Sequence, residues 1–378
     1  MEFLWEGFLA ITWKQAVMFL IGGVLIYLAI RKDYEPALLL PMGFGAILVN
    51  MPHSSVINHV VEGAGEVNGV IEWMFNVGID AAEAMPILLF IGVGAMIDFG
   101  PLLAKPTLFL FGAAAHLGIF ATLCISILAG FSLKDAAAIG IIGAADGPTV
   151  ILFSQILQTK YLGAITVAAY SYMALVPIIQ PAAIRLVTTK KERSIRMEYK
   201  PGEVSQTARI LFPILITLVT GFTAPEAAAL VGFLMFGNLI RECGVLHTLS
   251  DTAQNVLSNL ITLLLGITIS FTMQAEAFVR TETLLIMLLG LCAFIIDTMG
   301  GVLFAKFLNL FLKHKINPMV GGAGISAFPM SSRVVQKMAL KEDPQNFILM
   351  QAAGANVSGQ VASVVAGGVL IQLLAPYI

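Results

Sequence analysis

The sequence predicts an all-α polytopic membrane protein of about eleven spans, built as two inverted-repeat halves with broken or re-entrant helices. Three observations support this fold class. Only 12% of the 378 residues are charged, whereas soluble chains carry about 25%, and the mean hydropathy is +0.90. Apolar runs of membrane-spanning length recur along the whole chain. Two of these runs contain glycine, proline and polar residues that interrupt a helix.

The first expected element is an amphipathic helix that lies at the membrane interface. The stretch "MEFLWEGFLAITWKQAV" interrupts its apolar residues with Glu6 and Lys14, and it would hold Trp5 and Trp13 at headgroup level. Because the stretch lacks a basic n-region, we do not expect a cleavable signal peptide.

The membrane spans are expected at the apolar runs that end at charged residues, proline or glycine. In the first half these runs cover 16–30, 36–51, 84–99, 106–130, 136–157 and 161–187. In the second half they cover 207–222, 224–240, 255–274, 282–299, 301–312, 319–332 and 350–376. Several runs are shorter than the roughly 20 residues that a crossing helix needs. We therefore interpret some of them as broken or re-entrant helices.

The longest charged connection, "RLVTTKKERSIRMEYKPGE", divides the chain into nearly equal halves, 1–187 and 207–378. Its basic residues are Arg185, Lys190, Lys191, Arg193, Arg196 and Lys200. Because cytoplasmic loops of membrane proteins are enriched in Lys and Arg, the pattern predicts a cytoplasmic linker over 188–206 and a multi-pass protein of the cytoplasmic membrane. By the same rule the basic cluster "KHK" at 313–315 faces the cytoplasm.

The two halves contain related segments, which indicates an internal repeat. "KDAAAIGIIGAADGPT" begins at Lys134, and "KINPMVGGAGISAFPMSS" begins at Lys315. Their alignment pairs Asp135 with Asn317, Gly140 with Gly322 and, after one deletion, Pro148 with Pro329. Each segment follows a run with one acidic residue beside glycine, Asp98 in "AMIDFG" and Asp297 in "FIIDTMGG".

The two interrupted runs are the predicted functional site. Backbone that leaves helical geometry in lipid exposes unpaired N–H and C=O groups, so it survives only where it is buried in protein or lines a cavity. We expect one hairpin around Asp146 and another from Asn317 to Arg333. Oxygen ligands suit a hard cation such as sodium. Those available are free carbonyls and the side chains of Asp146, Thr149, Asn317 and Ser326. Alternatively, Asp146 caps a helix or pairs with a lysine for folding alone, and the glycines serve close packing.

Two other polar residues near the breaks each allow two interpretations. Tyr172, in "AAYSYMALVPIIQP", is either an interface anchor or a functional hydroxyl. Arg333, after "AFPMSS", is either a snorkelling end residue or the fork that holds a carboxylate substrate. The sequence contains no nucleotide-binding loop and no Cys/His cluster with metal spacing. A charged, desolvated pocket would therefore carry any catalysis.

Four long strings carry a family resemblance. They are "IGIIGAADGPTVILFSQIL", "YLGAITVAAYSYMALVPIIQPAAIRLVTTKKERSIRM", "NPMVGGAGISAFPMSSRVVQKMA" and "DPQNFILMQAAGANVSGQVASVVAGGVL". Together they closely resemble the beta subunit of the sodium-pumping, biotin-dependent decarboxylases of oxaloacetate, methylmalonyl-CoA and glutaconyl-CoA. The likeness covers essentially the whole chain, and strings of this length are far more specific than a short motif.

The resemblance implies an activity and its partners. The chain would receive carboxybiotin from a carrier domain on another subunit, decarboxylate it with consumption of a proton, and export sodium. The implied partners are a biotin-carrier and carboxyltransferase subunit, a small single-span membrane subunit, and further copies of this chain within the complex. Which acid is decarboxylated depends on the partner carboxyltransferase.

The resemblance also implies roles for individual residues. Sodium and proton handling falls on Asp146, Tyr172, Asn317, Gly321, Ser326 and Arg333. With the residue-based interpretation this gives Asp146, Thr149, Asn317, Gly321 and Ser326 as expected sodium ligands. Asp146, Tyr172 and Arg333 are the expected catalytic residues, with Tyr172 as proton donor and Arg333 as the contact for carboxybiotin.

Two other functions fit the composition and the breaks without the resemblance. One is a secondary sodium/proton antiporter or sodium-coupled symporter without decarboxylase activity. The other is a structural subunit in which the breaks are packing features, and it predicts that Asp146→Asn leaves activity unchanged.

Overall fold

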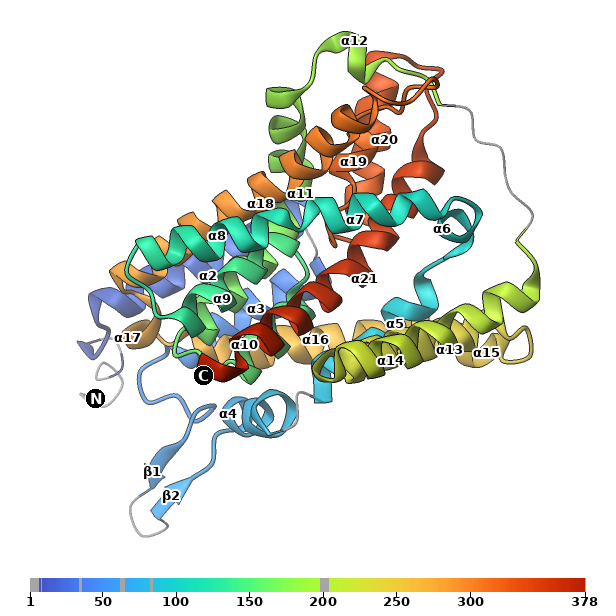
Figure 1. Cartoon of the computed structure of the whole chain (residues 1–378). Coiled ribbons are helices and arrows are strands. Elements are labelled where there is room, and N and C mark those ends of the chain that lie inside the picture. The colour runs from blue at the N-terminus through green and yellow to red at the C-terminus, as the bar shows by residue number, and fades with distance from the viewer. Residues whose placement is uncertain are drawn as a thin grey trace.

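The structure, a computed structural model, describes residues 7, 9–33, 36–61, 65–81, 84–197 and 204–377. This part of the chain is mainly helical, as predicted (Figure 1). Helices prevail because they pair every backbone N–H and C=O within one segment, as the hydrocarbon interior of a bilayer requires. Trp5 and Glu6 of the expected interfacial helix lie outside the described residues.

The first half of the described chain extends to the long helix α11. Its elements are α2 (Trp13–Lys32), α3 (Pro36–Val49), β1 (His59–Val61), β2 (Gly65–Val67), α4 (Val70–Phe75) with a π-helical turn (Asn76–Asp80), α5 (Ala84–Met96), α6 (Gly100–Ala104), a 3-10 turn (Pro106–Leu108), α7 (Phe109–Ala115), α8 (Leu117–Leu128), α9 (Leu133–Ile141) with a 3-10 turn (Ile142–Ala144), α10 (Gly147–Ile156) and α11 (Leu162–Val187). β1 and β2 pair antiparallel, with His59 opposite Val67.

The second half begins with a short helix in the basic linker. Its elements are α12 (Lys190–Arg193), α13 (Gln206–Thr223), a 3-10 turn (Pro225–Ala227), α14 (Ala228–Glu242), α15 (His247–Asp251), a π-helical turn (Thr252–Leu257), α16 (Ser258–Ile269), a 3-10 turn (Ser270–Met273), α17 (Ala275–Phe278), α18 (Thr281–Leu308), α19 (Met319–Gly322), α20 (Met330–Glu342), α21 (Leu349–Leu374) and a 3-10 turn (Ala375–Tyr377).

The described helices include several that can cross a membrane. Six are long and apolar enough: Trp13–Lys32, Pro106–Leu128, Gln206–Thr223, His247–Met273, Thr281–Leu308 and Leu349–Leu374. Two bent pairs, Val70–Asp80 with Ala84–Met96 and Leu162–Met173 with Leu175–Val187, raise the number to eight if each is one span. The all-α polytopic class is confirmed, and the count of about eleven spans stays a prediction.

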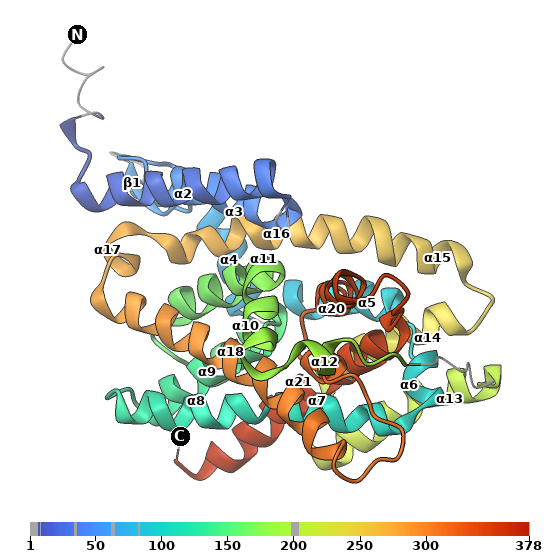
Figure 2. The same cartoon turned by 90° about the horizontal axis from the view of Figure 1, so that it is seen from above.

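The helices separate into an outer layer and a central group (Figure 2). α2 packs on α3 and α3 packs on α16, which places these helices along one side of the molecule. Gly22 and Gly43 allow the close approach of α2 and α3, since a Cβ on either would lie 2.7 Å from the carbonyl oxygen of the other. In the central group α18 contacts α7, α8 and α11, and α21 contacts α7 and α20. Both interrupted runs belong to this central group.

Two helices differ from the expected runs. The run 282–299 and the first part of the run 301–312 form one continuous helix, α18, which ends at Leu308, although glycine costs about 1 kcal/mol in a helix interior. Gly301 is kept there because the backbone of Gly321 packs directly against it. α2 begins at Trp13, earlier than the expected start at 16, because Thr12 and Gln15 form a capping box.

The long helix α11 bends by 72° between its parts Leu162–Met173 and Leu175–Val187. Pro177 explains the bend, because its ring lacks the N–H that would bond to the carbonyl of Met173 one turn earlier. Tyr172 therefore lies just before the bend.

Candidate functional site

The first interrupted run breaks at Asp146. α9 passes into a 3-10 turn, Ala145 then takes a left-handed conformation (φ 54°), and Asp146 is extended (φ −128°, ψ 95°). Pro148 lies in the first turn of α10, where the missing N–H of proline removes no helical hydrogen bond. The predicted break is therefore present, and it puts the Asp146 side chain at the start of a helix.

The Asp146 carboxylate is buried, with 5% of the residue exposed. Its Oδ2 accepts hydrogen bonds from Thr149 Oγ1 at 2.5 Å and Gln360 Nε2 at 2.7 Å, and Ser363 Oγ lies 3.5 Å away. All of these partners are uncharged. Because a buried carboxylate without a cationic partner is unfavourable, the arrangement suits a bound cation.

The tyrosines of α11 lie differently with respect to Asp146. The ring of Tyr170 packs against Gly147, and its buried hydroxyl has no hydrogen-bond partner among the described residues. Tyr172, two positions along the helix, points to α18, where its hydroxyl donates to the carbonyl of Met287. Residues two apart on a helix point about 200° apart, so only one of these rings can lie beside Asp146.

The second interrupted run contacts the first at its tip. Between α19 and α20 the backbone N–H of Ser326 donates to the carbonyl of Ala144 at 3.0 Å. The hydroxyl of Ser326 donates to the carbonyl of Gly359 at 2.9 Å, and His116 Nε2 lies 3.1 Å from it. The two breaks therefore meet, and Ser326 lies between them and α21.

Helix α21 carries the side chains that join the two breaks. Asn356 Nδ2 donates to the carbonyl of Ile325 at 2.7 Å, and one turn later Gln360 reaches Asp146. Asn356, Gln360 and Ser363 are not among the site residues that the sequence predicts. The sequence nevertheless contains a pattern that indicates them, because these polar residues are four and three positions apart and so lie on one face of an otherwise apolar helix.

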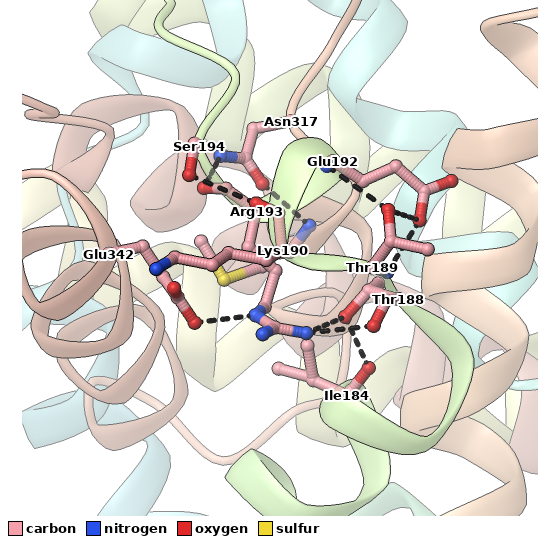
Figure 3. Close-up of polar contacts among 10 residues, drawn as sticks. Ile184, Thr188, Thr189, Lys190, Glu192, Arg193, Ser194, Asn317 and Glu342 are labelled. Atoms are coloured by element: carbon pink, nitrogen blue, oxygen red, sulfur yellow. Dashed lines mark hydrogen bonds and ion pairs between the residues drawn. The ribbon is translucent and has the colours of Figure 1, made fainter.

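Asn317 lies at the other end of the second hairpin, against the basic linker (Figure 3). Its Nδ2 donates to the carbonyls of Arg193 at 2.8 Å and Ile195 at 2.9 Å, and its Oδ1 accepts from the N–H of Met319 at 3.1 Å. Its amide is fully buried among these contacts and is not among the described partners of Asp146. Asn317 thus ties the hairpin to the linker.

Two ion pairs fasten the linker to α20. Arg193 Nε lies 2.7 Å from Glu342 Oε1, as Figure 3 shows, and Arg196 Nε lies 2.5 Å from Asp343 Oδ2. The hydrogen bond from Arg196 lowers the pKa of Asp343 below its ordinary value. Asp343 therefore stays charged at neutral pH, and the contact with Arg196 is lost only in acid.

Gly321 and Arg333 complete the predicted site residues. Gly321 packs its backbone directly on Gly301 of α18, and its carbonyl accepts the N–H of Gly324 at 3.0 Å. Arg333 is exposed in the first turn of α20. The structure thus brings Thr149 and Ser326 to the break at Asp146, whereas Asn317 contacts the linker, Gly321 contacts α18 and Tyr172 contacts Met287.

The acidic residues of the two preceding spans have unlike surroundings. Asp98 is partly exposed and lies 3.3 Å from Arg209 Nη1. Asp297 is fully buried in α18, next to Gly118 and Gly143, and neither carboxylate oxygen has a hydrogen-bond partner among the described residues.

Comparison with known proteins identifies the family. Residues 14–374 match the family described as Na+-transporting oxaloacetate decarboxylase beta subunit. The chain is 48% identical over 369 residues to the methylmalonyl-CoA decarboxylase subunit beta of Veillonella parvula, covering 98% of this chain and 95% of that protein. It is 46% identical over 369 residues to the glutaconyl-CoA decarboxylase subunit beta of Acidaminococcus fermentans, covering 98% and 96%. It is 43% identical over 420 residues to the probable oxaloacetate decarboxylase beta chain of Vibrio cholerae, covering 97% and 96%. The chain therefore belongs to the family of beta subunits of sodium-transporting decarboxylases, multi-pass proteins of the cell membrane.

Proposed function

We propose that this chain decarboxylates carboxybiotin delivered by a partner subunit and uses the released free energy to export sodium, with Asp146 as the charged sodium ligand. The observation that carries the proposal is the buried Asp146 carboxylate with its uncharged partners. A sodium ion would supply the positive charge that this buried carboxylate lacks. Membership in a family of sodium-transporting decarboxylase subunits supports the same activity.

The oxygen atoms around Asp146 suit a small hard cation. Thr149 and Ser363 contribute hydroxyl lone pairs, and the Gln360 amide can turn its oxygen toward an ion, because an amide carries an acceptor beside its donor. The hydrogen bond from Ser326 to Ala144 supports a role for Ser326 in the same sodium site around Asp146. The contact of Asn317 with the linker and the contact of Gly321 with α18 support a role for both residues in positioning the second hairpin.

Decarboxylation of carboxybiotin needs few catalytic groups from the protein. The bond between the ureido nitrogen and the carboxylate carbon breaks, the electron pair stays on the nitrogen, and that nitrogen takes up a proton as carbon dioxide leaves. Removal of water from the carboxylate favours this loss. Arg333 is the proposed contact for the carboxylate and Tyr172 the proposed proton donor. Since proton and sodium compete for Asp146, protonation of its carboxylate would release the ion.

The proposed complex contains other subunits. A biotin-carrier and carboxyltransferase subunit would load the carboxyl group, and a small single-span subunit and further copies of this chain would complete the assembly. The relatives are named as decarboxylase subunits, which favours this function over a plain sodium/proton antiporter or symporter. Related halves favour movement of one helix group against the other during transport.

The test uses the complete complex in inside-out membrane vesicles. We expect that added carboxybiotin releases carbon dioxide only when sodium is present, and that labelled sodium enters the vesicles at the same time. Carbon dioxide release that is indifferent to sodium would contradict the coupling. Sodium flux driven by a pH gradient without a biotin-bearing partner would indicate the plain transporter.

Gln360→Ala removes one hydrogen bond to Asp146 and one candidate oxygen ligand. We expect the sodium concentration for half-maximal decarboxylation to rise about tenfold, because a hydrogen bond to a charged group contributes about 1.5 kcal/mol. The measurement is carbon dioxide release as a function of sodium concentration. Gln155→Ala is the matched control: Gln155 Nε2 also donates to an aspartate at 2.7 Å, but at the exposed Asp80. An unchanged sodium requirement in Gln360→Ala would contradict the assignment.

A further inference from the structure

A pocket lies beside the basic linker, just after α12. Figure 1 shows α12 at the end of the molecule opposite β1 and β2. The volume of the pocket is about 750 Å³, within the range of about 300–1,000 Å³ that is typical of small-molecule sites. The walls come from four segments: the α6–α7 connection, linker residues 195–197, the loop 313–316 and the first turn of α21. The basic linker forms one wall, so we expect the pocket to face the cytoplasm.

The rim of the pocket is strongly basic. Lys105, Arg196, Lys313 and Lys315 line it, and the described lining residues include no Asp or Glu. Arg196 forms an ion pair with Asp343. Lys105, Lys313 and Lys315 do not take part in that ion pair. A concave site with one sign of charge concentrates ions of the opposite sign, so the pocket favours an anionic ligand.

The pocket is also lined by an unusual glutamine. Gln351, in the first turn of α21, is only 3% exposed, yet neither its amide nitrogen nor its amide oxygen has a hydrogen-bond partner among the described residues. Buried side-chain polar atoms are nearly always hydrogen-bonded, so this amide has a donor and an acceptor that remain available to a ligand. A primary amide offers a donor and an acceptor side by side, and it therefore fits a group with the complementary pair.

We propose that this pocket binds the carboxylated ureido head group of carboxybiotin as the carrier subunit presents it, a proposal that rests on the proposed function. A cyclic urea has a carbonyl beside its free N–H. The carbonyl accepts from Gln351 Nε2 and the N–H donates to Gln351 Oε1. The carboxylate on the other ring nitrogen faces Lys105 and Lys315. A phosphodiester group would satisfy the lysines, but it has no N–H or O–H and would leave the Gln351 oxygen without a donor.

The position of the pocket connects it to the ion site. Ile316, in its wall, directly precedes Asn317, which holds the second hairpin against the linker. Gln351 and Gln360 lie on the same helix, nine positions apart, which is about 14 Å along its axis. The pocket wall therefore includes the residue that precedes the second hairpin and the helix whose Gln360 reaches Asp146. Arg333 lies outside the described pocket lining, so capture of the head group and contact with Arg333 are separable.

The test compares two ligands in the purified complex at saturating sodium. One is N1-carboxybiotin methyl ester as substrate, and the other is biotin methyl ester, which has the urea without the carboxylate, as inhibitor. In Gln351→Ala we expect the KM for the substrate and the inhibition constant both to rise about tenfold, with kcat retained. In the double variant Lys105→Ala/Lys315→Ala we expect the KM for the substrate to rise and the inhibition constant to stay the same, because only the substrate has a carboxylate for the lysines. Gln351→Glu keeps the size of the side chain, and its added negative charge should weaken the carboxylated ligand more than the neutral one.

Two exposed residues outside the pocket serve as matched controls. Gln345→Ala and Lys191→Ala change exposed residues of the same types outside this pocket and should leave both constants unchanged. Wild-type constants in both Gln351 variants, or competition by inorganic phosphate as strong as that by biotin methyl ester, would overturn the pocket assignment. If the wild-type complex itself releases no carbon dioxide from carboxybiotin, the proposed function fails. If the wild type is active and the variants match it, only the pocket assignment fails.

Discussion

Asp146→Asn is expected to lower sodium-dependent decarboxylation of carboxybiotin about 100-fold or more, which corresponds to about 2.7 kcal/mol of transition-state stabilisation. The amide has nearly the shape of the carboxylate, so the break and its packing should persist, but the negative charge for sodium is lost. Thr149 and Gln360 would then have an amide oxygen as acceptor in place of the carboxylate. The measurement is carbon dioxide release by the complete complex over a range of sodium concentrations.

Asp251→Asn is the control for this prediction, because Asp251 is exposed in α15 and lies outside the described contacts of the breaks. The variant should behave as the wild type. A melting curve of each purified complex separates a loss of chemistry from a loss of folding. If Asp146→Asn retains wild-type activity and sodium dependence, Asp146 has only a structural role and the break is a packing feature.

Gly321→Ala and Gly301→Ala are each expected to impair the protein strongly, and to a similar extent. A Cβ at either position would overlap the backbone carbonyl of the other glycine, and a backbone carbonyl cannot move aside as a flexible side chain can. Overpacking of this kind costs about 1–3 kcal/mol, and separation of α19 from α18 would displace the whole second hairpin. The measurements are the melting temperature of the complex and its decarboxylation rate.

The two glycine variants also distinguish two roles of Gly321. If Gly321 acts only by close packing, both variants lose stability together and change the sodium requirement to the same extent. If its carbonyl binds sodium directly, Gly301→Ala raises the sodium concentration for half-maximal activity more than Gly321→Ala does, because the Cβ added at Gly301 would press on that carbonyl. Gly23→Ala and Gly221→Ala, helical positions with nothing within 4 Å of an added Cβ, should leave stability and activity unchanged.

Local sequence properties were enough to predict the fold class and the positions of the breaks. The length of an apolar run and the low charge content report burial in lipid without any knowledge of neighbours. Likewise, the Gly-Pro pair after Asp146 and the Pro and Gly residues between Asn317 and Arg333 disfavour a continuous helix through their own backbones. The continuity of α18 could not be predicted in this way, because Gly301 is kept in the helix by its contact with Gly321.

By itself, the sequence determined that this is a polytopic helical protein with a carboxylate at a helix break, since hydrophobicity and helix breaking act over a few neighbouring residues. The tertiary structure alone decided which side chains meet that carboxylate. Gln360 reaches Asp146 across 214 positions, and Asn317 bonds to Arg193 across 124. It also decided that Tyr170 packs beside the break while Tyr172 points to α18. These contacts depend on how distant helices pack and rotate against one another, and no short stretch of sequence encodes that packing.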